Sequence, residues 1–155
     1  MPGALNHSPA DILRQLIVDI GAGVAPTVAS TTDWQTYVGM EPDERSGAEQ
    51  VITVTNTAGV PKGRVGQGER QIFHGANLRI RAKTHATGYV KANATAILLD
   101  SVYQRDVVIG GTTYLVHSVN RQGDILDLGK GDTPNNRYTF FSINVLFVTD
   151  KRPLT

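Results

Sequence analysis

Two segments of this chain show a period of two, strict in residues 77–83, and this pattern constrains the fold more than any other feature. In residues 77–83 every second position is apolar, at Leu78, Ile80 and Ala82. In residues 137–148 one face carries Thr139, Phe141, Ile143, Val145 and Phe147. Because successive side chains of a strand point to opposite faces, a period of two predicts strands with one covered face. We therefore expect the chain to build a sheet.

Residues 8–20 have the spacing of an amphipathic helix. Their apolar side chains recur at intervals of three and four, at Ile12, Leu13, Leu16, Ile17 and Ile20. Ser8 is a favourable N-cap, Pro9 suits the first helical position, and Asp11 stands where the acid of a capping box belongs. Gly21 is expected to end this helix.

A second helix is predicted at 87–104. One stripe of that segment carries Tyr89, Ala92, Ala96, Leu99 and Tyr103, and Thr87 is its expected cap. Further strands are expected at 34–38, 50–55, 107–109, 113–119 and 125–128. Gly110 and Gly111 separate two of these strands and indicate a tight hairpin.

This order of elements predicts an α+β fold, a mostly antiparallel sheet with two helices packed on it. A chain of 155 residues fits one domain, 1–155. Residues 56–76 contain five glycines and one proline and show neither a helical nor a strand period. We therefore predict a long, glycine-rich, extended loop at 56–76, of the kind that is usually functional when it occurs in a small domain.

The charges are unevenly distributed along the chain. Residues 1–61 have a net charge of −5, from Asp11, Asp19, Asp33, Glu41, Asp43, Glu44 and Glu49 against Arg14 and Arg45. Residues 62–91 have a net charge of +6, from Lys62, Arg64, Arg70, Arg79, Arg81, Lys83 and Lys91 against Glu69. Such a split suits a subunit that meets copies of itself head to tail, with opposite charges facing. Unrelated solvated faces would produce the same pattern, and the sequence does not choose between the two.

Several classes of protein are disfavoured by what the sequence lacks. The chain has no cysteine, which excludes disulfides and thiolate metal sites. No apolar run approaches the roughly 18 residues that a membrane helix needs. Residues 1–11 lack the basic and apolar regions of a secretory signal. We expect a soluble protein made in the cytoplasm, with no membrane partner.

No motif for catalysis or for a cofactor is apparent. The four histidines, His7, His74, His85 and His117, are not at metal-ligand spacing to one another. The glycines of 63–68 match no phosphate-binding loop. We predict no enzyme activity, no metal and no cofactor. The alternative is a small hydrolase with a dispersed site, for which Asp100, Asp106 and His117 are the candidates.

Several short motifs together are similar to a known family. The strand ending in ITVTNTAG, the segment GQGE and the run HGANLRIRAK resemble the tail terminator, or minor capsid, family of long-tailed siphophages. Thr57 and Gly59 match the family's turn, Gly68 and Glu69 its loop, and Arg79 and Arg81 its strand before the second helix. The segments 111–119 and 137–140 are similar to the closing strands. The likeness departs at His74-Gly75, where Pro-Gly is usual, and at Asn77, where Gln is common.

The resemblance implies a structural function. Members of that family form hexameric rings that cap the tail tube, stop its polymerisation and join it to the head-completion proteins, while phage DNA passes through the lumen without sequence-specific binding. It implies a location in the virion, at the neck of the tail, after assembly in the host cytoplasm. The alternative within this class is another neck or tail subunit, such as a head-completion or tube protein. The residues expected to contact other subunits or the tube are Lys62, Arg64, Glu69, Arg70, Phe73, Arg79, Arg81 and Lys83.

Overall fold

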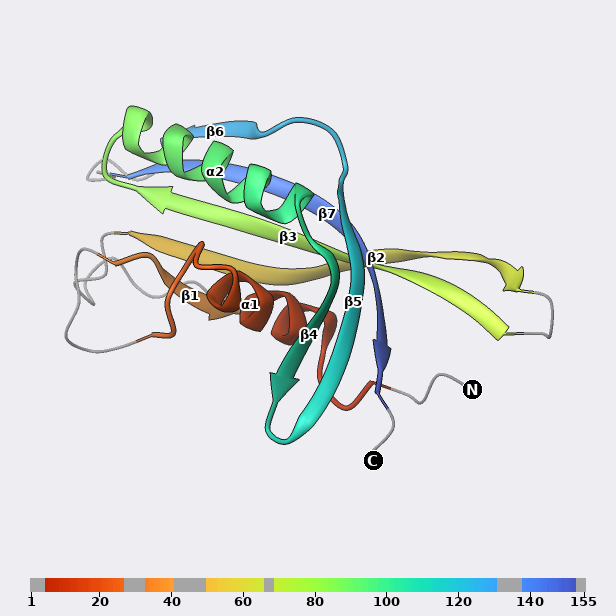
Figure 1. Cartoon of the computed structure of the whole chain (residues 1–155). Coiled ribbons are helices and arrows are strands. Elements are labelled where there is room, and N and C mark those ends of the chain that lie inside the picture. Colours follow the sequence, from red (N-terminus) through yellow and green to blue (C-terminus); the bar gives the residue numbers. More distant parts are fainter. Residues whose placement is uncertain (1–4, 27–32, 41–49, 66–68, 131–137, 153–155) are drawn as a thin grey trace.

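The computed structural model describes residues 5–26, 33–40, 50–65, 69–130 and 138–152, and the side chains of 61–65 and 69–71 lie outside that description. The elements are α1 (Pro9–Asp19), β1 (Gln35–Val38), β2 (Val51–Val65), β3 (Glu69–Ala82), α2 (His85–Asp100), β4 (Tyr103–Ile109), β5 (Thr112–Arg121), β6 (Leu126–Lys130) and β7 (Thr139–Lys151). Their arrangement is shown in Figure 1.

The seven strands form one curled sheet. Its order is β1-β2-β3-β7-β5-β4, and β6 pairs with β7. Strands β5 and β6 follow one another along the edge of β7 that lies opposite β3. The pairing of β1 with β2 is parallel, and the other described pairs are antiparallel. The predicted α+β class, with two helices on a mostly antiparallel sheet, is therefore confirmed.

Both helices pack on the same face of the sheet and share one core (Figure 1). Across the middle strands, Ile52 of β2, Ile80 of β3 and Phe141 of β7 stand side by side in register. All three are buried, and each contributes about 1.5–3 kcal/mol through the apolar surface it removes from water. The alternation predicted for 77–83 and 137–148 is thus the inner face of β3 and β7.

The first helix forms as its sequence predicts. Ser8 caps it, Asp11 completes the capping box, and Ile20 is the C-cap. Its apolar stripe is buried against the sheet. Residues 5–7 are held beside it because the buried Tyr114 hydroxyl accepts the backbone N–H of Asn6 and of His7, at 3.2 and 3.1 Å.

The second helix begins and ends earlier than predicted. Thr84, rather than Thr87, is its N-cap, and the Thr84 hydroxyl accepts the backbone N–H of Thr87. The helix ends at Asp100, so Tyr103 belongs to β4 and is exposed. The predicted apolar stripe is buried only at Ala92, Ala96 and Leu99. The boundaries differ from the prediction because apolar residues such as Val90 and Ile97 stand outside the predicted stripe, which leaves the helical period poorly marked.

The tight turn between β4 and β5 is confirmed. Gly110 and Gly111 both adopt positive φ, 53° and 82°. A type I′ turn requires positive φ at both central positions, which glycine adopts without a steric penalty. No helix within the described ranges is long and apolar enough to cross a membrane.

Candidate interaction surfaces

The prediction of a loop at 56–76 is wrong for the described part of that segment, which forms two paired strands. β2 continues to Val65, and β3 begins at Glu69. The register runs from Thr57↔Gly75 through Val60↔Phe73 to Val65↔Glu69. Residues 66–68 between the two strands are outside the described residues. The described side chains of residues 56–60 are exposed, so no buried face imposes a strand period there.

Residues 57–65 and 69–73 form a ribbon that extends beyond the rest of the sheet. Strand β1 pairs with β2 only at Val51–Val54, and β7 pairs with β3 only from His74 onward. The ribbon therefore has no third strand beside it in the described structure. Figure 1 shows it projecting from the body of the molecule.

Two glycines permit the close approach of strands at the base of this ribbon. The register shifts between Thr57 and Val60, which marks a bulge. A Cβ on Gly59 would lie 2.4 Å from the Phe73 carbonyl oxygen, and one on Gly75 would lie 2.6 Å from the Ala58 carbonyl oxygen. Both oxygens belong to the backbone of the paired strand and cannot move without disturbing that pairing, so glycine is required at these positions. A bulge of this kind bends and twists the strands that follow it.

The backbone positions of the predicted contact residues in the ribbon are clear. Lys62 pairs with Gln71, Arg64 pairs with Arg70, and Glu69 pairs with Val65. The side chains of Lys62, Arg64, Glu69 and Arg70 lie outside the described part of the structure. Phe73 is half-buried at the ribbon base, opposite the exposed Val60.

The three basic residues that alternate with the apolar positions of 77–83 have different environments. Arg79 is exposed, and its guanidinium carbon lies 4.2 Å from the centre of the Phe140 ring. Lys83, just after the strand, is also exposed. Arg81, however, is only 1% exposed, with its guanidinium carbon 5.0 Å from the centre of the Tyr138 ring. The expectation that Arg81 contacts another subunit is therefore wrong, because its charge is already buried within its own protomer.

The candidates for a dispersed active site do not come together. Asp100 accepts two hydrogen bonds from the Arg121 guanidinium, at 3.0 and 2.7 Å. Asp106 accepts one from Arg152 at 2.7 Å, and His117 lies 2.6 Å from Asp150. Each is thus engaged in a separate contact. No group of three or more His, Asp or Glu side chains in the described ranges is arranged to hold a metal ion.

The structure also reveals histidine contacts that the sequence did not indicate. His85 at the start of α2 lies 2.7 Å from Asp127 of β6. This hydrogen bond, with a second from the Gly129 N–H, lowers the pKa of the exposed Asp127 carboxyl. Burial lowers the pKa of His74, an effect that the charge of Asp150 opposes. These contacts join residues far apart in the chain, so no local spacing would have predicted them.

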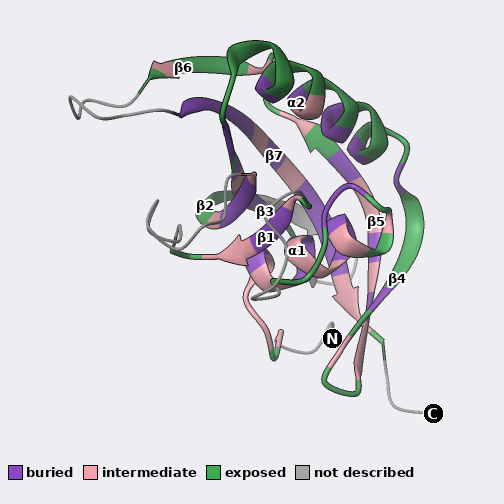
Figure 2. Ribbon diagram, turned by 90° about the vertical axis from the view of Figure 1, so that its left-hand side faces the viewer, coloured by how far each residue is buried: buried purple, intermediate pink, exposed green. Residues whose placement is uncertain are grey.

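A further surface, missed by the sequence reasoning, lies on the outer side of α2. Figure 2 shows that side of the helix as exposed and its inner side as buried. The exposed positions include Tyr89, Val90, Ile97 and Leu98. The signal was present in the sequence, since between His85 and Asp100 the helix has a single charged residue, Lys91. The stripe predicted from Tyr89 to Tyr103 accounted only for a core-facing side, so the apolar residues on the other side of the helix were not expected to form a surface.

The acidic residues of the N-terminal third are only partly described. Asp11 is engaged in the capping box, and Asp19 accepts a hydrogen bond from Gln15. Glu41, Asp43, Glu44 and Glu49 lie outside the described residues. Comparison with known proteins adds no assignment, since no protein-family model and no curated protein matches the chain.

Proposed function

We propose that this protein is a structural subunit of a phage tail terminator, which forms a ring that caps the tail tube and joins it to the head-completion proteins. The observation that carries the proposal is the ribbon. A two-stranded ribbon that projects without a third strand is marginal by itself and gains stability when another surface covers it. Such an element suits contact with a second protein better than it suits a protein that acts alone.

Charge and composition support a contact between copies. The ribbon contributes Lys62, Arg64 and Arg70 from a segment of net positive charge, whereas residues 1–61 have a net charge of −5. Opposite charges on two separate surfaces favour head-to-tail contacts, and such heterologous contacts close into rings when the rotation allows it. The hexameric copy number, the tube, the connector and the passing DNA come from the sequence resemblance alone.

The exposed Arg79 and Lys83 fit the same proposal. Arg79 lies on the outer face of the sheet, Lys83 follows directly after β3, and both side chains are exposed. In a ring they would face a neighbouring subunit or the DNA backbone, whose phosphates attract basic groups irrespective of sequence. Another neck or tail subunit would use the same surfaces, and its position in the particle would distinguish it. Cryo-electron microscopy of virions with the subunit located would make that distinction.

The test is to shorten the ribbon without disturbing the body. Because Val60 and Phe73 are register partners, residues 61–72 can be replaced by an Asn-Gly turn that closes the hairpin there. We expect the variant to remain folded, with a melting temperature close to that of the unchanged protein. We expect it to form no rings and to leave tail tubes uncapped and overlong.

The matched control changes a hairpin at the other side of the sheet. Extending the β4–β5 turn with two residues between Gly110 and Gly111 should leave ring formation and tube length unchanged. Native mass spectrometry and negative-stain images of tubes provide both readouts. A shortened-ribbon variant that still forms rings and caps tubes of normal length would contradict the proposal.

A further inference from the structure

The exposed side of α2 has the character of a surface that is covered in an assembly. Val90 is 67% exposed and Ile97 is 58% exposed, although both are large and apolar. A contiguous apolar surface on a helix, free of charge over most of its length, is unusual on a protein that remains alone in water.

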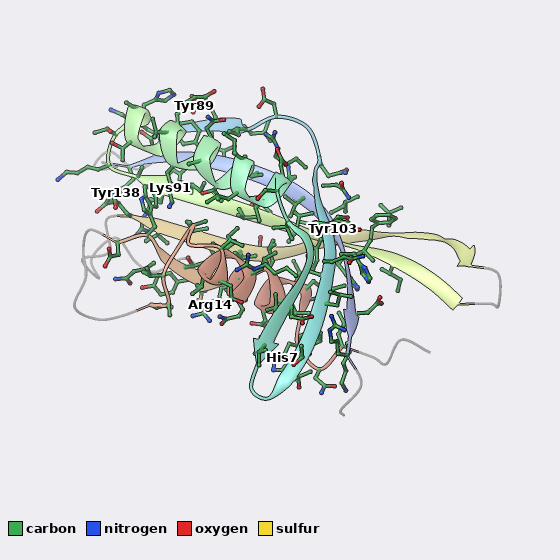
Figure 3. The ribbon with its side chains drawn as sticks, in the orientation of Figure 1. His7, Arg14, Tyr89, Lys91, Tyr103 and Tyr138 are labelled. Atoms are coloured by element: carbon green, nitrogen blue, oxygen red, sulfur yellow. The ribbon has the colours of Figure 1, made fainter. Side chains whose placement is uncertain are left out.

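A groove of about 420 Å³ runs beside the first half of this helix, lined by Trp34, Ala86, Thr87, Val90, Lys91 and Ala94. We refer to it as the α2 groove. The Lys91 ammonium lies 5.4 Å from the centre of the Trp34 ring. Figure 3 labels Lys91 below α2 and Tyr89 above it. Apart from the lysine and the threonine hydroxyl, the lining is apolar.

Lys91 brings a positive charge into the groove without an acid to balance it. No carboxylate in the described part of the chain lies within ion-pair distance of its ammonium. Burial lowers the pKa of Lys91, because it removes water from around the charged ammonium. A half-buried cation on an apolar wall is stabilised by an occupant that supplies a carboxylate together with apolar side chains.

Strand β6 and the residues just before it supply both an exposed carboxylate and exposed apolar side chains. Leu126 is 50% exposed and Leu128 is 51% exposed. Asp124 lies two residues before β6, is exposed, and accepts a hydrogen bond from the adjacent Ile125 N–H. Its charge also acts on the nearby Arg121 guanidinium, whose stronger partner is Asp100. Within the described sheet β6 pairs with β7 alone, so its other edge is open.

The groove and β6 of one protomer lie on different flanks of α2 and do not reach each other. His85 contacts β6 through Asp127, whereas Lys91 contacts Trp34. Six residues at 3.6 residues per turn place these two side chains roughly 120° apart around the helix. The two complementary surfaces of one chain can therefore meet only between copies.

We propose that the α2 groove of one copy receives β6 of the next copy, with Lys91 paired to Asp124 and with Leu126 and Leu128 packed on Val90 and Trp34. This inference rests on the proposed ring and names one of its contacts. The two surfaces differ, so the contact is heterologous and propagates from copy to copy.

Engineered cysteines test the contact directly, because the chain has no cysteine of its own. Val90→Cys and Leu126→Cys are made as separate single variants, since both side chains are exposed. Mixing the two under mild oxidation should give a disulfide-linked pair of chains. Leu126→Cys mixed with Val108→Cys, an exposed residue of β4, is the matched control and should give none.

A charge exchange provides the second readout. Lys91→Glu should weaken self-association by roughly 30-fold or more, and adding Asp124→Lys should restore it. Asp19→Lys in the Lys91→Glu background, an exposed acid on α1, should not restore it. Melting temperatures confirm that each variant is folded, and analytical ultracentrifugation measures the association.

The outcomes separate the two proposals. If the unchanged protein forms rings but Val90→Cys and Leu126→Cys do not cross-link, or if the charge exchange fails to restore association, this contact is wrong and the ring stands. If the unchanged protein remains monomeric at high concentration and low salt and is absent from virions, the proposed function fails and the contact fails with it.

Discussion

Arg79 and Arg81 lie two residues apart on one strand, yet their side chains have different environments. Both point away from the helices, as the alternation requires. Arg79 remains exposed over Phe140, whereas Arg81 is buried with Tyr138 beside it. A period of two determines which face a side chain takes, but whether that face is open depends on chain segments distant in sequence.

This difference predicts opposite effects of the same substitution. Arg79→Glu should leave the protomer folded and should impair assembly. The free energy of unfolding should fall by about 0.5–1 kcal/mol, because the cation–π contact with the Phe140 side chain is lost. Arg81→Glu should destabilise the protomer itself by about 3–5 kcal/mol, because it places an unpaired negative charge in a buried site. Urea unfolding of both variants and ring formation by the first are the measurements. Normal assembly and infection by Arg79→Glu particles would remove Arg79 from the interface.

Leu78 provides a test of the core on the opposite face of the same strand. It is fully buried between Val54 and Ile143 in register. Leu78→Ala should lower the free energy of unfolding by about 2–5 kcal/mol, through the lost apolar contact and the cavity left behind. Leu126→Ala, at an exposed position, is the control and should cost far less. If Leu78→Ala lowers the free energy of unfolding by less than about 1 kcal/mol, the surrounding core must collapse into the space that the side chain leaves.

At the scale of elements, the ribbon is the largest departure from the sequence prediction. Its glycines and its lack of period indicated a loop, but most of it is paired strand. A periodic pattern arises only where one face of a strand is buried. Residues 56–60 are exposed, so their sequence was free of that constraint, and Gly59 and Gly75 serve the bulge instead.

The ribbon should be the least protected part of the sheet in the isolated protomer. Hydrogen exchange at Val60 and Ile72 should be much faster than at Leu78 and Ile80, because a two-stranded ribbon is marginal without a covering surface. Protection at the two ribbon residues should rise in the ring. Equal protection of both pairs in a monomer would show that the ribbon is rigid without a partner.

At the scale of the whole molecule, assembly is expected to depend on charge. The acidic N-terminal third and the basic segment 62–91 belong to the same chain. Contacts between exposed opposite charges are screened over roughly 10 Å at 0.1 M salt, whereas apolar contacts are not weakened in that way. Ring stability should therefore combine a salt-sensitive part with an apolar part.

Raising the salt concentration from about 0.05 to 0.5 M should shift rings toward smaller species, as observed by native mass spectrometry and ultracentrifugation. The variant Lys91→Glu should be less salt-sensitive than the unchanged protein, since it has lost a pair of opposite charges and salt screens the repulsion between the new carboxylate and Asp124. Rings that are indifferent to salt would mean that the charge split lies on unrelated solvated faces.

The sequence by itself determined the first helix, its capping box, the inner faces of β3 and β7, and the Gly110-Gly111 turn. Each depends on residues within about one turn or one strand of each other, where side-chain period and backbone preference act directly. Tertiary structure alone decided the rest. The burial of Arg81, the contact of His85 with Asp127, the projection of the ribbon and the contact of Lys91 with Trp34 all depend on segments that are distant in sequence and meet only when the sheet curls around its core.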